Sequence, residues 1–332
     1  AQLKAINNAT AGTITLNDYT VALSGNSADV TAALGGTFAA AYTGAVTLSD
    51  NHTLAQLKAI NDATSGTITL NDYSVALSGT IADLTAALAA TLAATYTGTA
   101  TASGTQSGAS GVSAVNALAA LTTGNVTATV SGTAAQAAVL TTVATDVIAV
   151  TVSNAHTLAQ LKAINNATAG TITLNDYTVA LSGTIADLTA ALAGTLGATY
   201  TGTATASGTQ SGASGVSAVN ALAALTTGNV TATVSGTAAQ AAVLTTVATD
   251  VIAVTVSNAH TLAQLKAINN ATAGTITLND YTVALSGNSA DVTAALGGTF
   301  AAAYTGAVTL SDNHTLAQLK AINDATSGTI TL

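Results

Sequence analysis

The sequence predicts an α/β repeat solenoid, in which strand-turn-helix coils of 22–30 residues stack with a parallel sheet on one side and short helices on the other. Three observations lead to this prediction. The motif AQLKAIN recurs at fixed spacings, as in repeat architectures. Threonine-rich stretches alternate with apolar residues at period two, which is typical of strands. Alanine- and leucine-rich stretches follow them and begin with helix-capping residues.

The copies of AQLKAIN describe the organisation of the chain. They begin at residues 1, 55, 159, 263 and 317, so their spacings are 54, 104, 104 and 54 residues. Residues 1–70 are identical to residues 263–332. One super-repeat therefore covers 1–262, and 263–332 begins the next copy. We expect 1–332 to be one continuous solenoid, taken from a longer periodic chain whose true N-terminus lies before residue 1.

Each 104-residue block divides into four units of strand, turn and helix. They cover 125–146, 147–170, 171–200 and 201–228, with lengths of 22, 24, 30 and 28 residues. The 54-residue block keeps only the 24- and 30-residue types, so ten coils make one super-repeat. Because a helix that joins two parallel strands crosses over in the right-handed sense, stacked coils are the expected arrangement.

Strands are predicted where every second residue is apolar, as in NVTATV (125–130) and VIAVTV (147–152). The stretch TITLNDYTVAL (13–23) differs, because its apolar phase changes at Asn17-Asp18. Since Asn and Asp favour turns, we expect two short strands with a corner between them. The alternative fold is a pure β-solenoid, in which the Ala/Leu stretches would be short strands or loops.

Helices of about ten residues are predicted from capping boxes, in which a threonine and a residue three positions later bond reciprocally. In HTLAQLKAIN (52–61), Thr53 and Gln56 have this spacing, and apolar residues follow at helical intervals. Aspartate replaces glutamine in other copies, where its charge also complements the helix dipole. The predicted pairs are Thr53 with Gln56, Thr80 with Asp83, Thr133 with Gln136, Thr157 with Gln160, Thr184 with Asp187 and Thr237 with Gln240.

Composition excludes several classes of function. Charged residues make up 6% of the chain, with five lysines, no arginine and a net charge of −9, so no basic patch is available for nucleic acid. There is no cysteine, which excludes disulfides and thiolate metal sites. Thr, Ser, Gly or Asn interrupts every long apolar run, so no membrane span is predicted.

Every histidine and lysine belongs to the repeated motif. A catalytic histidine needs an orienting acid, but Asp50 lies near His52 whereas no acid precedes His156 or His260. The histidines are also 54 or 104 residues apart, so they cannot readily converge on one metal ion. We therefore predict that the chain is not an enzyme and has no catalytic, cofactor or metal residues. His52 should lie at the surface, and Lys58 should extend to solvent.

Calcium-loop motifs, tyrosines and outward-facing threonines are the features that could indicate a binding function. No calcium-loop motif such as GGxGxDxU is present, so calcium is not supported as a cofactor in this stretch. The eight tyrosines are predicted to cover the ends of the small-residue core, and the alternative is stacking on carbohydrate. Outward rows such as Thr127 and Thr129 are similar to the flat threonine arrays of ice-binding solenoids, although such threonines are also ordinary in strands.

The repeats VTATVSGTAAQAAVLTT, VALSGTIADLTAAL and TLAQLKAIN resemble those of giant tandem-repeat secreted or cell-surface proteins of bacteria, cyanobacteria included. These proteins are adhesin-like, and the resemblance extends over all 332 residues and is compositional. It implies an extracellular or cell-surface location and a structural or adhesive role, and it supplies no catalytic residues.

The expected function is a structural repeat segment of a long extracellular fibre, stalk or surface coat that assembles into filaments. The expected partner is the chain itself, through coil stacking and lateral or end-to-end association, because exposed strand edges invite pairing. The alternative is an adhesin or a carbohydrate- or ice-binding module, with cell-surface glycans as partners. An enzyme of the pectate-lyase solenoid type would need Asp clustered with Arg or Lys, and arginine is absent.

Overall fold

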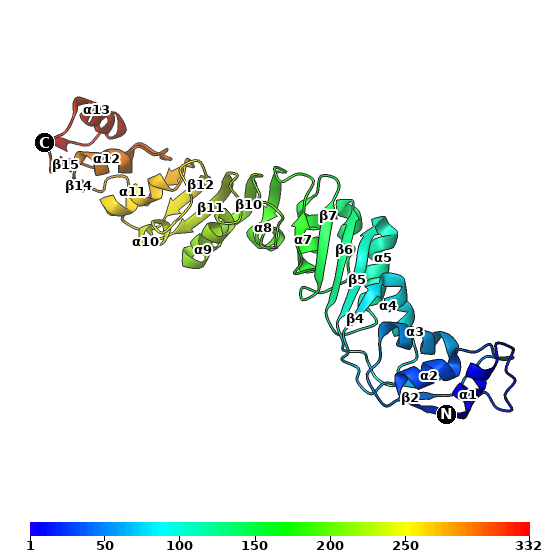
Figure 1. Ribbon diagram of the computed structural model, residues 1–332. Helices are drawn as coiled ribbons and strands as arrows, with labels where there is room; N and C mark the ends of the chain where they lie inside the picture. Colours follow the sequence, from blue (N-terminus) through cyan, green and yellow to red (C-terminus); the bar gives the residue numbers. More distant parts are fainter. The chain divides into compact units, whose positions relative to one another are not determined.

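The computed structural model describes residues 1–332 as an α/β protein in which short strands alternate with helices (Figure 1). The chain divides into two compact units. The first consists of residues 1–155 and 163–175, and the second of residues 156–162 and 176–332. Helix α7 (Leu158–Asn166) contributes residues to both units.

The first unit contains two parallel sheets. In chain order its elements are α1 (Gln2–Ala9), β1 (Leu23–Gly25), α2 (Ser27–Leu34), β2 (Val46–Leu48), α3 (Leu54–Ala63), β3 (Ile68–Thr69), β4 (Leu77–Thr80), α4 (Ile81–Leu88), β5 (Ala100–Ser107), α5 (Gly108–Ala119), β6 (Val126–Gly132), α6 (Ala134–Ala137), β7 (Val147–Val152) and β8 (Ile172–Thr173). The strand orders are β1-β2-β3 and β4-β5-β6-β7-β8. Each strand therefore pairs with its neighbours in the sequence.

The second unit repeats this organisation in the opposite order of sheets. Its elements are β9 (Leu181–Thr184), α8 (Ile185–Leu192), β10 (Ala204–Ser211), α9 (Gly212–Ala223), β11 (Val230–Gly236), α10 (Ala238–Ala241), β12 (Val251–Val256), α11 (Leu262–Asn270), β13 (Ile276–Thr277), β14 (Leu285–Gly287), α12 (Ser289–Leu296), β15 (Val308–Leu310), α13 (Leu316–Ala325) and β16 (Ile330–Thr331). Strands β9 to β13 form one parallel sheet, and β14 to β16 form the other.

The prediction of an α/β fold with parallel sheets is confirmed. Strand and helix alternate, neighbouring strands are parallel and sequential, and no sheet closes into a barrel, which is compatible with a repeat solenoid. The Ala/Leu stretches form helices, so the pure β-solenoid alternative is wrong. The 22-residue coils have the shortest helices, such as α6 with four residues. The β-branched residues of the VLTTV run that follows α6 favour helix weakly.

A corner in each unit ends one sheet and begins the next, where the apolar phase of the sequence changes. In the first unit, Asn71-Asp72 lies between β3 and β4, which belong to different sheets. The Asp72 carboxylate accepts the Ser74 N–H at 2.8 Å and the Ser74 hydroxyl at 2.6 Å. Two short strands therefore flank this corner, whereas in 13–23 only an isolated bridge at Ile14 precedes β1.

The core consists of inward-facing side chains that stack in register from strand to strand. In the first unit, Val130 of β6 pairs with Val150 of β7, which pairs with Ile172 of β8. All three are buried, as are Leu57 and Ile60 on α3. Neighbouring strands therefore place their buried side chains side by side, and the helices add further apolar side chains to this core.

Candidate functional site

The predicted cap residues lie at helix starts. Thr53 Oγ1 accepts the N–H of Gln56 at 3.2 Å, and Gln56 Oε1 accepts the N–H of Thr53 at 2.8 Å, so α3 begins with a complete capping box. The same reciprocal bonds join Thr133 with Gln136, Thr157 with Gln160 and Thr237 with Gln240. These bonds satisfy N–H groups that the first turn of a helix leaves without partners.

The two caps that combine threonine with aspartate are built differently. Thr80 and Thr184 accept the N–H of Asp83 and Asp187, at 3.1 Å in both cases. Each threonine hydroxyl then donates to the same aspartate's carboxylate at 2.8 Å. The carboxylate therefore binds the cap side chain, and the reciprocal bond to the cap N–H is not made.

Loss of the Thr53 hydroxyl should have a measurable cost. We expect Thr53→Ala to lower the free energy of unfolding of the first unit by about 1 kcal/mol, the usual value of a threonine cap. Urea unfolding followed by circular dichroism measures it. Thr95→Ala is the matched control, because Thr95 is exposed and its hydroxyl has no partner in the protein. Equal losses in the two variants would contradict the role of the cap.

Each lysine side chain forms an ion pair with an aspartate, in addition to being partly exposed to solvent. Lys58 bonds Asp62 within α3 at 2.7 Å. In the copies where asparagine replaces this aspartate, the ammonium group instead bonds the aspartate near the start of the next helix; these pairs are Lys4 with Asp29, Lys162 with Asp187 and Lys266 with Asp291. All the side chains are partly exposed, so water screens the pairs and their stabilisation is small.

The histidines are buried, and the prediction that His52 lies at the surface is wrong. His52, His156 and His260 are only 3–4% exposed. A tyrosine 44 residues later packs edge-on against each ring; for His52 it is Tyr96, with 6.1 Å between the ring centroids. In the sequence, His52 simply precedes a helix cap. Only the folded chain brings Tyr96, 44 residues later, over its ring.

Each buried pair forms a short chain of hydrogen bonds. Tyr200 donates its hydroxyl proton to the Val179 carbonyl at 2.6 Å, and its oxygen lies 3.2 Å from His156 Nε2. Because the hydroxyl proton is already engaged, the imidazole must donate from Nε2. The Nδ1 atom is then the unprotonated nitrogen, and it is buried without a partner. The other two sets are His52–Tyr96–Val75 and His260–Tyr304–Val283.

Burial shifts the pKa values of both members of each pair. It lowers the pKa of His52, His156 and His260, although nearby carboxylates act in the opposite direction. It raises the pKa of Tyr96, Tyr200 and Tyr304 to about 12. In both cases the low polarity of the surroundings disfavours the charged form. These groups are therefore held neutral and are closed to any external substrate.

The raised tyrosine pKa values predict a loss of stability in alkali. Tyrosine ionises near pH 10 in the unfolded chain but near pH 12 in the folded protein. Stability from these tyrosines is therefore present below about pH 10 and falls as the pH rises further. We expect the thermal midpoint to fall between pH 10 and 11.5, and to fall less when Tyr96, Tyr200 and Tyr304 are all replaced by Phe. Equal falls in the two proteins would contradict this assignment.

A second set of contacts lies at a T-x-G corner between a helix and the next strand, and this corner was not predicted from the sequence. Thr122 donates its hydroxyl to the Gly98 carbonyl, 24 residues earlier, at 2.8 Å and accepts the Gly124 N–H at 3.0 Å. A Cβ on Gly124 would lie only 2.3 Å from that carbonyl oxygen. The equivalent threonines, with bonds of 2.8–3.0 Å, are Thr64, Thr168, Thr226, Thr272 and Thr326. The recurrence of T-x-G before strands is the signal that could have revealed the corner.

Two buried aspartates also bind the start of a strand 20 residues earlier, and they were not predicted from the sequence. Asp146, which is 4% exposed, accepts the Val126 N–H at 2.6 Å and the Val143 N–H at 2.9 Å. Asp250 accepts the Val230 and Val247 N–H groups at 2.7 and 2.8 Å. The signal in the sequence is an aspartate directly before the strand VIAVTV in both copies.

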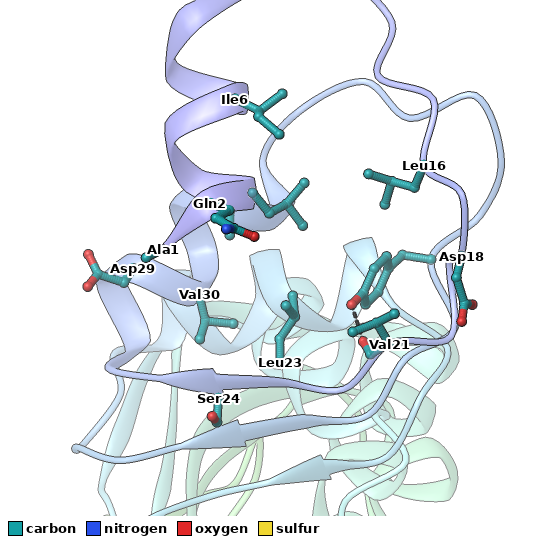
Figure 2. A pocket seen from close by; sticks show the side chains of 13 residues that line it. Ala1, Gln2, Ile6, Leu16, Asp18, Val21, Leu23, Ser24, Asp29 and Val30 are labelled. Atoms are coloured by element: carbon teal, nitrogen blue, oxygen red, sulfur yellow. Dashed lines mark hydrogen bonds between the residues drawn. The ribbon is translucent and has the colours of Figure 1, made fainter.

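The hollow beside α1 is lined mainly by apolar side chains, together with polar ones such as Asp18, Asp29 and Tyr42. Its volume is about 330 Å³. Figure 2 shows Ile6, Leu16, Val21 and Leu23 around it. Ile6 is 48% exposed, whereas Ile268 in the identical second copy of this sequence is fully buried. The hollow therefore exposes side chains that belong to the core in the other copy.

No three His, Cys, Asp or Glu side chains gather in an arrangement that could hold a metal ion. None of the helices has both the length and the apolar character needed to cross a membrane. Comparisons with protein-family models, curated proteins and solved structures found no match to this chain. The polar contacts described above join parts of the chain to one another.

Proposed function

We propose that this chain is a structural repeat segment of a long extracellular fibre, stalk or surface coat, built as a solenoid that assembles into filaments. The observation that carries the proposal is the recurrence of the T-x-G corner. In six coils the threonine bonds a carbonyl 20 or 24 residues earlier. Because the same bond recurs from one repeat to the next, such a protein lengthens by adding copies.

Asparagine side chains support the same proposal on the helical side. In the first unit, Asn61 Nδ2 donates to the Ala86 carbonyl of the next coil at 2.6 Å. Asn116 donates to the Val139 carbonyl at 2.9 Å and accepts the Thr141 N–H at 2.8 Å. The polar side chains thus bind backbone groups that a helix end or loop leaves without partners. Their use favours a structural role over the binding of an external ligand.

The outer surfaces support association between chains. The strands of each five-stranded sheet contain no charged residue, although charges are a common protection of strand edges. Val139, Val143 and Val147 are 44–60% exposed. Uncharged hydroxyl and valine surfaces of this kind suit side-by-side packing of like chains. The chain itself is therefore the proposed partner.

The alternative of an ice- or carbohydrate-binding module has less support. The row that contains Thr101 and Thr127 continues with Val147, and the row of Thr105 and Thr129 continues with Ala149. Neither row is a continuous threonine array. Four of the eight tyrosines are buried in the core, where their rings cannot stack on sugars; they are Tyr42, Tyr96, Tyr200 and Tyr304.

Electron microscopy and diffraction test the proposed function. We expect the purified chain to form unbranched filaments, with strands perpendicular to the filament axis and a reflection near ~4.8 Å along it. A monodisperse monomer at every concentration would overturn filament assembly. Antibody labelling of intact source cells tests the extracellular location, and labelling only after permeabilisation would contradict it.

A further inference from the structure

We propose that the three buried histidine–tyrosine pairs make the packing of the chain sensitive to acid. When an imidazole takes up a proton, the contact opens between the segment that carries the histidine, just before a helix cap, and the segment that carries the tyrosine. The proposal concerns the pairs His52–Tyr96, His156–Tyr200 and His260–Tyr304. It does not depend on filament formation, because each pair lies within one compact unit.

The geometry leaves no place for a second proton on the imidazole. In the second unit, His156 Nε2 already donates to Tyr200, whose own proton is bound to the Val179 carbonyl. A new proton would go to Nδ1, which is buried and has no acceptor. A buried N–H of a charged ring without a partner is strongly unfavourable. The ring must therefore move toward water when it is protonated.

The carboxylates around each ring do not supply the missing acceptor. Asp72 and Asp50 act on His52 only through space, Asp176 acts on His156, and Asp280 acts on His260. The carboxylates of Asp72, Asp176 and Asp280 instead bind the Ser or Thr two residues later in their own turns. Their attraction for the charged ring is smaller than the cost of burial, and the pKa of each histidine is lowered.

The sign of the pH effect follows from this direction. Histidine in the unfolded chain takes up its proton near pH 6.5, whereas the folded rings resist protonation to lower pH. The stability that the neutral pairs contribute is therefore present above about pH 6.5 and is lost as the pH falls below it. The chain has no glutamate or cysteine, so between pH 5 and 6.5 histidine is the side chain that titrates.

Urea unfolding between pH 7.5 and 5.0 tests the proposal on the full chain. For each paired histidine, the unfolding equilibrium constant should rise by up to about tenfold per pH unit below 6.5. A variant with His52→Gln, His156→Gln and His260→Gln keeps a donor toward each tyrosine but cannot titrate. We expect its unfolding constant to change much less over this range. The same rise in the variant as in the original chain would overturn the proposal.

His314→Gln is the matched control, because His314 is partly exposed and no tyrosine hydroxyl bonds its ring, although its Nδ1 is buried without a partner as in the other three. This variant should retain the pH dependence of the original chain. If the triple variant does not fold, NMR titration of the imidazole protons in the unmodified chain decides the question. Three rings should titrate below pH 6.5, together with faster hydrogen exchange around Tyr96, Tyr200 and Tyr304 at pH 5. Titration of the three paired rings at or above pH 6.5 would overturn the proposal.

Discussion

Gly124→Ala is expected to destabilise the first unit by about 3 kcal/mol or more, because backbone atoms cannot move aside as a side chain can. A Cβ at this position would lie 2.3 Å from the Gly98 oxygen and 2.4 Å from the Thr97 oxygen. Relief requires the two coils to separate. That movement would also break the hydrogen bond from Thr122 to the Gly98 carbonyl.

The matched control for this substitution is Gly35→Ala. Gly35 follows α2 with φ −72° and ψ 0°, and alanine occupies the equivalent place after α4 with nearly the same angles. Its added Cβ would meet the nearest backbone oxygen at 3.3 Å rather than 2.3 Å. We expect at most a small change for Gly35→Ala, measured by urea unfolding of both variants. Similar losses at the two positions would show that close packing of coils is not the cause.

Asp146→Ala is the second large effect that we expect, with a loss of about 3 kcal/mol. The substitution leaves the N–H groups of Val126 and Val143 without the carboxylate that now accepts them. Hydrogen bonds to a charged group contribute about 1.5–3 kcal/mol each, and a buried donor left unsatisfied adds its own penalty. Asp146→Asn should lose less, because the amide oxygen can still accept one of the two N–H groups.

Hydrogen exchange gives the direct test of this carboxylate. We expect the amide protons of Val126 and Val143 to exchange faster in Asp146→Ala than in the original chain. Asp72→Ala is the control, because its carboxylate binds only Ser74 in an exposed turn, and it should cost much less stability. Unchanged exchange at Val126 and Val143 would show that Asp146 does not hold the two coils together.

Much of the local structure could be predicted from the sequence, because it depends on neighbours along the chain. Threonine at Thr53 and glutamine three residues later are enough to begin a helix, and the structure contains that capping box. The change of apolar phase at Asn-Asp placed the corner between short strands such as β3 and β4. Period-two alternation identified the inward faces of β6 and β7.

The candidate site was predicted less well, because its contacts join residues from different coils. His52 has polar neighbours in the sequence and was placed at the surface. Tyr96, 44 residues away, covers it in the structure. Asp146 and Thr122 also bind partners 20 and 24 residues earlier, at the start of a neighbouring strand. A single sequence does not show which side chain of one coil lies over which carbonyl of the next.

The sequence by itself determined the repeat, the alternation of strand and helix, the caps and the corners. Each of these depends on the helix, strand or turn propensity of a residue and on the spacing of residues within one unit. Only the tertiary structure decided which polar groups are buried and what they bind, because burial depends on the coil stacked alongside. The histidine of HTLAQLKAIN is the plainest case. In the sequence it is a polar residue that precedes a helix cap. In the folded chain it is buried and neutral, and it donates to a tyrosine hydroxyl.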